Sequence, residues 1–132
     1  MTIRVTRDRT GKMRHVVEVR GHRVVVDELP AVGGDDTGPT PHDLYDAAIG
    51  ACKAITMVWY ANRKSLPLTD VSVTIERDDS DERKGSYRLR ASLTLGGDLT
   101  DAQREELRAV ADKCPVHRLM TQVTSEITTV LA

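Results

Sequence analysis

One long helix is the feature that most constrains how this chain folds. The sequence predicts it from Thr40 to Lys64, with Thr40 as a suitable N-cap. Pro41 fits the first helical position, and Asp43 completes a pattern like a capping box. Apolar side chains recur at helical spacing on one face, which we expect to be buried: Leu44, Ala48, Ala51, Cys52, Ile55 and Val58. The pattern therefore predicts a thiol, Cys52, on the buried face of a helix that is rich in small residues.

Short segments of alternating apolar and polar residues flank this helix and predict strands. Three precede it, at residues 2–8, His15–Arg20 and Arg23–Val26, with tight turns that include Gly21-His22. Two follow it, at Asp70–Arg77 and Ser86–Leu95, and Thr121–Ala132 is a β-branched segment that we expect to be a last strand. A second helix is expected after the capping pair Thr100 and Gln103, with Cys114 on its apolar face and Pro115 at its end. The order βββ-α-ββ-α-β predicts an α+β fold with antiparallel sheets around the long helix.

Length and charge narrow the class of protein. With 132 residues we expect a single domain, residues 1–132. The net charge is −1 and acids and bases are mixed, so neither nucleic acid nor an anionic membrane is an expected partner. No apolar run is long enough to span a bilayer, and the first residues lack a signal core. We therefore expect a cytoplasmic protein, in which a disulfide is more often catalytic or regulatory than structural.

The two cysteines are not equivalent in this sequence. Cys52 is too far from the start of its helix to be activated by the helix dipole, so a nucleophilic Cys52 needs a cation from elsewhere, most naturally an arginine. His42 and Asp43 lie roughly 15 Å up the helix from Cys52 and could hold such an arginine. Cys114, expected at a helix C-terminus, suits the role of capturing a sulfenic acid on Cys52 as a disulfide.

Other interpretations of these residues stay open at this point. A lone cysteine on an apolar helix face is usually a core residue, and the chain could then be a binding module for a small apolar molecule. An acyl-transfer enzyme would need His42 or His117 as the base for Cys52. A metal site from Cys52, Cys114, His117 and His42 has no supporting spacing, so we expect neither a metal nor a cofactor.

Two motifs resemble those of the OsmC/Ohr family of thiol peroxidases. The first runs from Asp36-Thr37-Gly38-Pro39-Thr40-Pro41-His42-Asp43-Leu44 to Gly50-Ala51-Cys52. The second is Ala111-Asp112-Lys113-Cys114-Pro115-Val116-His117-Arg118. The residues of these motifs are more similar to those of a less-characterised OsmC-like branch than to those of the organic hydroperoxide resistance branch. The order of elements agrees with the family over the whole chain.

This resemblance implies an intertwined homodimer and a peroxidase that reduces organic hydroperoxides in oxidative-stress defence. It implies that Cys52 becomes a sulfenic acid, that Cys114 captures it, and that a dithiol such as a lipoyl group restores both thiols. The organic hydroperoxide resistance branch has a glutamate that holds the activating arginine, where this chain has His42, with Asp43 beside it. For that arginine we expect Arg20 first and Arg23 second, with Arg7 and Arg9 as further candidates and His117 in a supporting role.

Overall fold

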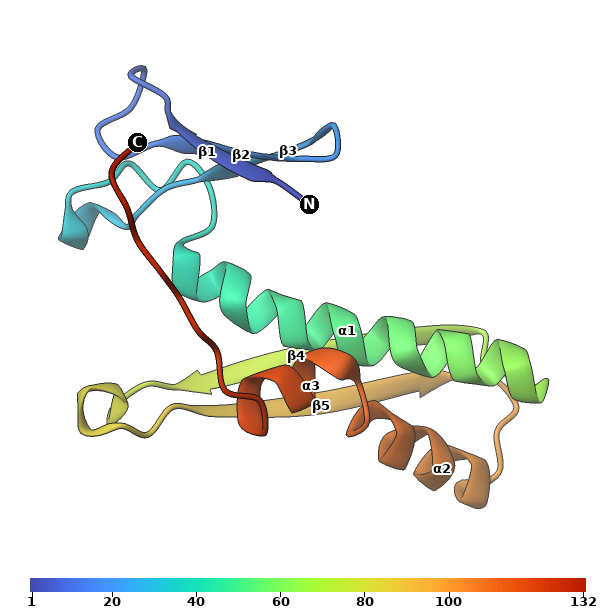
Figure 1. Cartoon of the computed structure of the whole chain (residues 1–132). Coiled ribbons are helices and arrows are strands. Elements are labelled where there is room, and N and C mark those ends of the chain that lie inside the picture. Colours follow the sequence, from blue (N-terminus) through green and yellow to red (C-terminus); the bar gives the residue numbers. More distant parts are fainter. The chain divides into compact units, whose positions relative to one another are not determined.

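The structure, a computed structural model, describes all 132 residues of the chain, which form two compact units. The first unit is Met1–Asp46 and the second is Ala47–Ala132. The long helix α1 (Pro41–Lys64) begins in the first unit and continues in the second (Figure 1). The single domain expected from the length stays a prediction.

The first unit holds a three-stranded antiparallel sheet in the order β1-β2-β3. The strands are β1 (Ile3–Arg7), β2 (His15–Val19) and β3 (His22–Val26), as a meander requires. Arg20 and Gly21 form the turn between β2 and β3, and both have positive φ, 48° and 82°. Such a two-residue turn matches the right-handed twist of its strands. The turn therefore lies one residue earlier than the predicted Gly21-His22.

The loop after β3 contains the short helix η1 (Pro30–Val32) and is held by a buried carboxylate, Asp27. Asp27 accepts hydrogen bonds from the hydroxyl and the backbone N–H of Thr37 and from the backbone N–H of Glu28. The Thr37 hydroxyl is the main cause that lowers the pKa of Asp27 from 3.8 to about 2. The loop that leads into α1 is thus fastened to the end of the sheet.

Both ends of α1 are formed by identifiable caps. The Thr40 N–H donates to Asp43 Oδ2 at 3.0 Å, and the Asp43 N–H donates to Thr40 Oγ1 at 3.1 Å. This confirms the predicted capping box. At the other end Ser65 has a φ of 53°, and the Leu66 N–H donates to the Ala61 carbonyl at 2.9 Å. These contacts satisfy backbone groups that a helix leaves unpaired at its ends.

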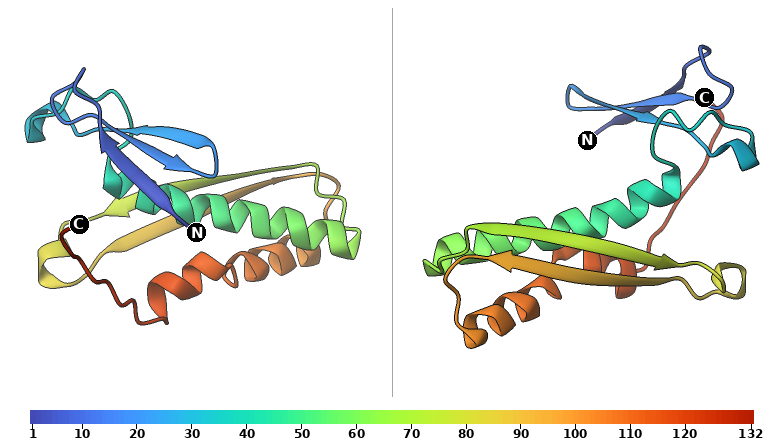
Figure 2. Two further views of the ribbon diagram at one scale, coloured as in Figure 1. Left: turned by 45° about the horizontal axis from the view of Figure 1, so that its top comes forward. Right: turned by 180° about the vertical axis from the view of Figure 1, so that it is seen from behind.

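The second unit packs its helices on one face of a hairpin. β4 (Asp70–Asp78) and β5 (Arg88–Gly96) are antiparallel, with the short helix η2 (Glu82–Lys84) in their turn. α1, α2 (Asp101–Ala111) and α3 (Pro115–Thr121) lie on the same side of this hairpin (Figure 2). The core consists of Met57 and Ala61 from α1 with Leu107 and Ala111 from α2, and apolar side chains of β4 and β5 pack against it.

The predicted α+β class, the antiparallel sheets and the order of the elements are confirmed. One difference concerns residues 124–132 of the expected last strand, which run to the C-terminus without a strand partner (Figure 1). A strand is defined by hydrogen bonds to a neighbour, and this exposed segment has none within the chain.

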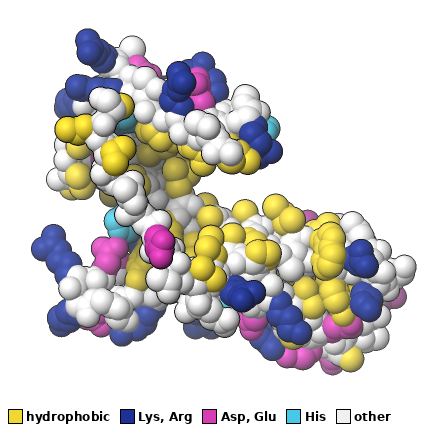
Figure 3. Space-filling model, viewed as in Figure 1, with side chains coloured by type: hydrophobic (Ala, Val, Ile, Leu, Met, Phe, Trp, Pro, Cys, Tyr) yellow, Lys and Arg dark blue, Asp and Glu magenta, His cyan; other side chains and the backbone are white.

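The buried face of α1 differs from the predicted one. Ile49, Met57 and Ala61 are buried, whereas Ile55 is 69% exposed and Trp59 is 57% exposed. Most of the expected stripe, namely Ala48, Ala51, Ile55 and Val58, is therefore exposed in the single chain. The helix has apolar residues on both sides, so periodicity alone could not choose between them. Figure 3 shows apolar side chains gathered along α1, whereas charged side chains gather over α2.

None of the helices combines the length and the apolar character that a membrane span needs.

We expect Met57→Ala to lower the free energy of unfolding by about 3 kcal/mol, because it leaves a cavity where Met57 is fully buried. Urea denaturation measures this. The matched control is Met57→Leu, which nearly conserves volume and should cost less than about 1.5 kcal/mol. Equal losses in the two variants would show that Met57 does not occupy a close-packed core.

Asp27 should make the stability depend on pH in acid. Its folded pKa of about 2 lies below the ordinary 3.8, so its contribution is complete above about pH 4 and is lost as the pH falls towards 2. Thermal unfolding between pH 7 and pH 2 should therefore show a gap between wild type and Asp27→Asn that closes below pH 4. The exposed aspartate Asp98 gives the control, Asp98→Asn, which should follow the wild-type curve. A gap that is constant with pH would contradict the role given to Asp27.

Candidate functional site

The structure brings the two cysteines together within the second unit. Cys52 is half-buried on α1, whereas Cys114 lies in the connection between α2 and α3 and is 0% exposed. Both are free thiols, and Cys114 is within hydrogen-bonding reach of Cys52. A partly exposed cysteine thus lies next to a fully buried one.

The position of Cys114 differs from the predicted helix C-terminus. α2 ends at Ala111, and Cys114 is the N-cap of α3, with its backbone in the extended region. Pro115 is the cause, because a residue before proline avoids helical geometry and proline itself fits the first position of a new helix. The Cys114 sulfur accepts a hydrogen bond from the His117 N–H at 3.4 Å. The prediction that Cys114 closes the second helix is therefore wrong, and the helix dipole does not oppose its thiolate.

Burial raises the pKa of the Cys114 thiol, and the neighbouring Cys52 raises it further. The hydrogen bond from the His117 N–H and the positive charge of Lys53 act in the opposite direction. Burial is the largest of these effects, so Cys114 is a protonated thiol at neutral pH. Of the two sulfurs, the more exposed Cys52 is better placed to meet a substrate first.

Lys53 belongs to this site, although the sequence analysis did not select it. Its side chain is 7% exposed, and its Nζ donates to the Ala111 carbonyl at 3.0 Å. Nζ also lies 3.0 Å from His117 Nδ1 and 3.5 Å from Asp112 Oδ1. The signal was present in the sequence, because a lysine four residues after Ile49 and four before Met57 interrupts an apolar face.

The remaining predicted residues belong to the first unit. Arg20 is exposed in the turn between β2 and β3, and Arg23 on β3 forms an exposed ion pair with Glu18 at 3.3 Å. His42 and Asp43 lie in the first turn of α1, where Asp43 completes the capping box. The roles of these residues toward Cys52 stay predictions.

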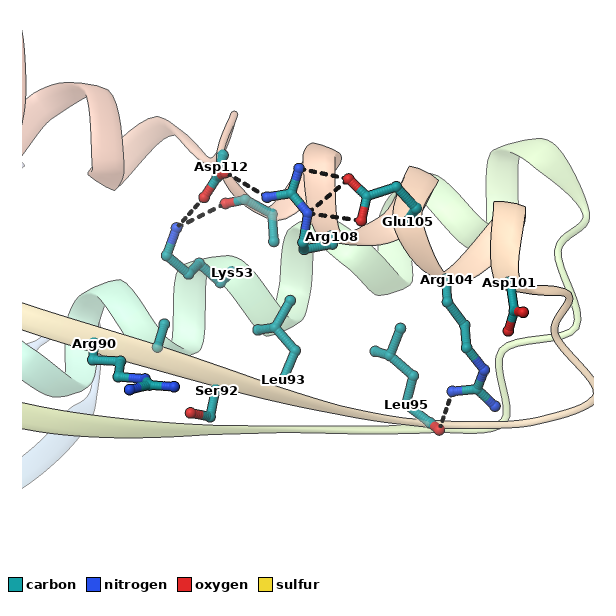
Figure 4. Close-up of a pocket in the computed structure, with 12 residues that line it drawn as sticks. Lys53, Arg90, Ser92, Leu93, Leu95, Asp101, Arg104, Glu105, Arg108 and Asp112 are labelled. Atoms are coloured by element: carbon teal, nitrogen blue, oxygen red, sulfur yellow. Dashed lines mark hydrogen bonds and ion pairs between the residues drawn. The ribbon is translucent and has the colours of Figure 1, made fainter.

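A groove of about 570 Å³ lies between β5 and α2 (Figure 4), and Lys53, the neighbour of Cys52 in sequence, is among the residues that line it. Leu93 and Leu95 contribute apolar surface, and Lys53 borders the groove close to Asp112. Arg108 bonds both Glu105 and Asp112, and Lys53 also pairs with Asp112, so these four charged side chains of the groove are paired with one another. No group of three or more His, Cys, Asp or Glu side chains is arranged to hold a metal ion.

Fold and site together define an α+β protein with a pair of neighbouring thiols. The family of OsmC-like proteins matches residues 33–129, and the chain belongs to this family. The resemblance of the two cysteine motifs to the OsmC/Ohr family is thereby confirmed. No curated protein sequence matches the chain.

Solved structures are similar to this fold over most of its length. A Psychrobacter arcticus protein, described as an osmotic stress induced and detoxification response protein, has a TM-score of 0.78 and 16% identity, over 92% of this chain and 89% of that one. The organic hydroperoxide resistance protein OsmC of Legionella pneumophila has a TM-score of 0.67 and 21% identity, over 92% and 88%. OhrB of Bacillus subtilis, also an organic hydroperoxide resistance protein, has a TM-score of 0.59 and 19% identity, over 92% and 90%.

The environment of Cys114 should be visible in its titration. In Cys52→Ser protein, Cys114 is the only thiol, and burial should keep its pKa above the ordinary 9.0. Thiolate absorbance at 240 nm, followed against pH, measures this. Cys114→Ser protein is the matched control for the signal of Cys52 alone. A Cys114 thiolate that forms below pH 8 would contradict the structure.

Proposed function

We propose that this protein is a cysteine-based peroxidase that reduces organic hydroperoxides in oxidative-stress defence. Membership of the OsmC-like family supports a general role in the response to peroxides. Two structurally similar proteins carry the name organic hydroperoxide resistance protein, which favours this substrate class. The observation that carries the proposal is the closeness of half-buried Cys52 to fully buried Cys114.

The proposed reaction has two steps at sulfur. The Cys52 thiolate attacks the terminal oxygen of the hydroperoxide, the O–O bond breaks, and the alkoxide takes a proton to leave as an alcohol. Cys52 is then a sulfenic acid. The Cys114 sulfur attacks the Cys52 sulfur, the S–O bond breaks, and hydroxide leaves with the Cys114 proton as water. A dithiol, for example a lipoyl group, then reduces the Cys52–Cys114 disulfide and is itself oxidised.

The exposure of the two thiols agrees with this division of roles. The first step needs a sulfur that the substrate can reach, and Cys52 is the more exposed of the two. The second step needs a thiol next to Cys52 that does not itself react with the peroxide. Burial keeps Cys114 protonated and away from solvent. Arg20 is the proposed cation for the Cys52 thiolate, with Arg23 next, and His42 and Asp43 as supports.

A homodimer is part of the proposal. The side of α1 with Ile55, Val58 and Trp59 is exposed in the single chain, and large apolar side chains in one patch are typical of an interface. A second copy that packs on this face would bury them. The cytoplasmic location stays a prediction.

The test is a titration of the reduced protein with cumene hydroperoxide and, separately, with hydrogen peroxide. Intact mass and free thiols are followed in time. Wild type should lose both thiols per equivalent of organic peroxide, faster than with hydrogen peroxide. Cys52→Ser should react at least about a hundredfold more slowly, because the exposed nucleophile is gone.

Cys114→Ser is the matched variant for this experiment. It should still reduce one equivalent of peroxide and then hold a Cys52 sulfenic acid that dimedone traps. Peroxide consumption by Cys52→Ser at the wild-type rate would contradict the proposal. Thiols of the wild type that survive excess peroxide would instead favour a protein that binds a small apolar molecule.

A further inference from the structure

The ammonium group of Lys53 connects α1 to the backbone around Cys114. All three of its close acceptors belong to residues on either side of this cysteine: the Ala111 carbonyl, Asp112 Oδ1 and His117 Nδ1. An ammonium group has three N–H donors and no acceptor, so these contacts use its full capacity. His117 Nδ1 must then accept, which places the proton of the neutral ring on Nε2.

Burial of the Lys53 ammonium costs free energy, so its retention in the protein interior suggests a function for its charge. An ammonium group that is 7% exposed loses most of its hydration, and its one carboxylate partner lies at 3.5 Å and is itself half-exposed. An apolar side chain at this position would continue the buried face made by Ile49 and Met57. Two of the three contacts instead go to neutral groups next to Cys114. This arrangement ties a positive charge to both sides of the segment that carries Cys114.

We propose that Lys53 is a positioning residue for disulfide formation, which holds Cys114 against Cys52 and stabilises the Cys114 thiolate with its charge. The proposal rests on the proposed function, because disulfide formation is the second step of that reaction. As the S–S bond forms, Cys114 loses its proton to the departing hydroxide and its sulfur briefly carries negative charge. The Lys53 charge is already in place beside it, and Lys53 itself undergoes no chemical change.

The groups that act on this step come from three elements. Cys52 and Lys53 lie on α1, Asp112 follows α2, and His117 lies on α3. The Lys53 charge lowers the pKa of Cys114, against the larger effect of burial, which raises it. The step should therefore slow in acid, because less of Cys114 is then in the thiolate form that Lys53 stabilises.

The test compares Lys53→Met, which removes the charge but keeps the length, with Lys53→Arg, which keeps the charge. Stopped-flow measurements with one equivalent of cumene hydroperoxide separate Cys52 oxidation from disulfide formation. Lys53→Met should slow disulfide formation by about tenfold and move its pH profile to higher pH, because the charge that favours the Cys114 thiolate is gone. Cys52 oxidation should change by less than about threefold, well below that effect.

Two controls make the result specific to the charge. Lys64→Met removes an exposed lysine from the same helix and should behave as wild type. Lys53→Arg should keep the wild-type pH profile even if it forms the disulfide more slowly. If Lys53→Met fails to fold by circular dichroism, Lys53→Gln makes the same comparison with a hydrogen-bonding, uncharged side chain.

A second oxidant keeps this inference separate from the peroxidase proposal. Diamide oxidises neighbouring thiols to a disulfide and is itself reduced to a hydrazine, without any peroxide. Wild-type protein that does not react with hydroperoxide but forms the disulfide with diamide would contradict the peroxidase proposal. The comparison of the Lys53 variants could then still be made with diamide. If Lys53→Met forms the disulfide at the wild-type rate and with the wild-type pH profile, with either oxidant, the proposed role of Lys53 is overturned. Equal slowing in the Met and Arg variants with an unchanged pH profile would also overturn it.

Discussion

The contact between α1 and α2 is the interaction on which the rest of the second unit depends. Met57 and Ala61 of α1 are buried against Leu107 and Ala111 of α2. Because Ala111 is also the last residue of α2, this contact determines where the following connection lies. Cys114 follows three residues later, so the hydrophobic core and the thiol pair are parts of one packing arrangement. Lys53 joins the two by bonding the Ala111 carbonyl from α1.

Much of this fold follows from short-range patterns in the sequence. The capping box of Thr40 and Asp43, the capping pair of Thr100 and Gln103 and the strands β1 to β5 were all predictable, because each depends on residues close together in the chain. The two motifs also identified both cysteines as a possible pair. These predictions needed no knowledge of tertiary packing.

The errors arose where packing decides between equivalent patterns. α1 has apolar residues on opposite sides, and the structure buries Ile49 and Met57 rather than Ile55. Because the buried side of α1 could not be chosen, Lys53 was not recognised as part of the site. A lysine on a helix is usually solvated, and only the structure shows that its side of α1 is buried. Cys114 was misplaced because Pro115 begins a new helix and does not merely end the previous one. The arginine partner of Cys52 could not be selected, because it depends on contacts between segments far apart in sequence.

The unequal exposure of the two sulfurs also has a consequence for how such a disulfide would be opened. An incoming thiolate must approach one sulfur in line with the S–S bond, and Cys52 is the partly exposed residue of the two. The mixed disulfide with the reductant would therefore form on Cys52, and Cys114 would be the leaving group. A leaving thiolate departs faster when its charge is stabilised, and Cys114 leaves next to the Lys53 ammonium. The exposure of Cys52 would thus decide which sulfur the reductant attacks, and Lys53 would favour the opening of the bond as well as its closing.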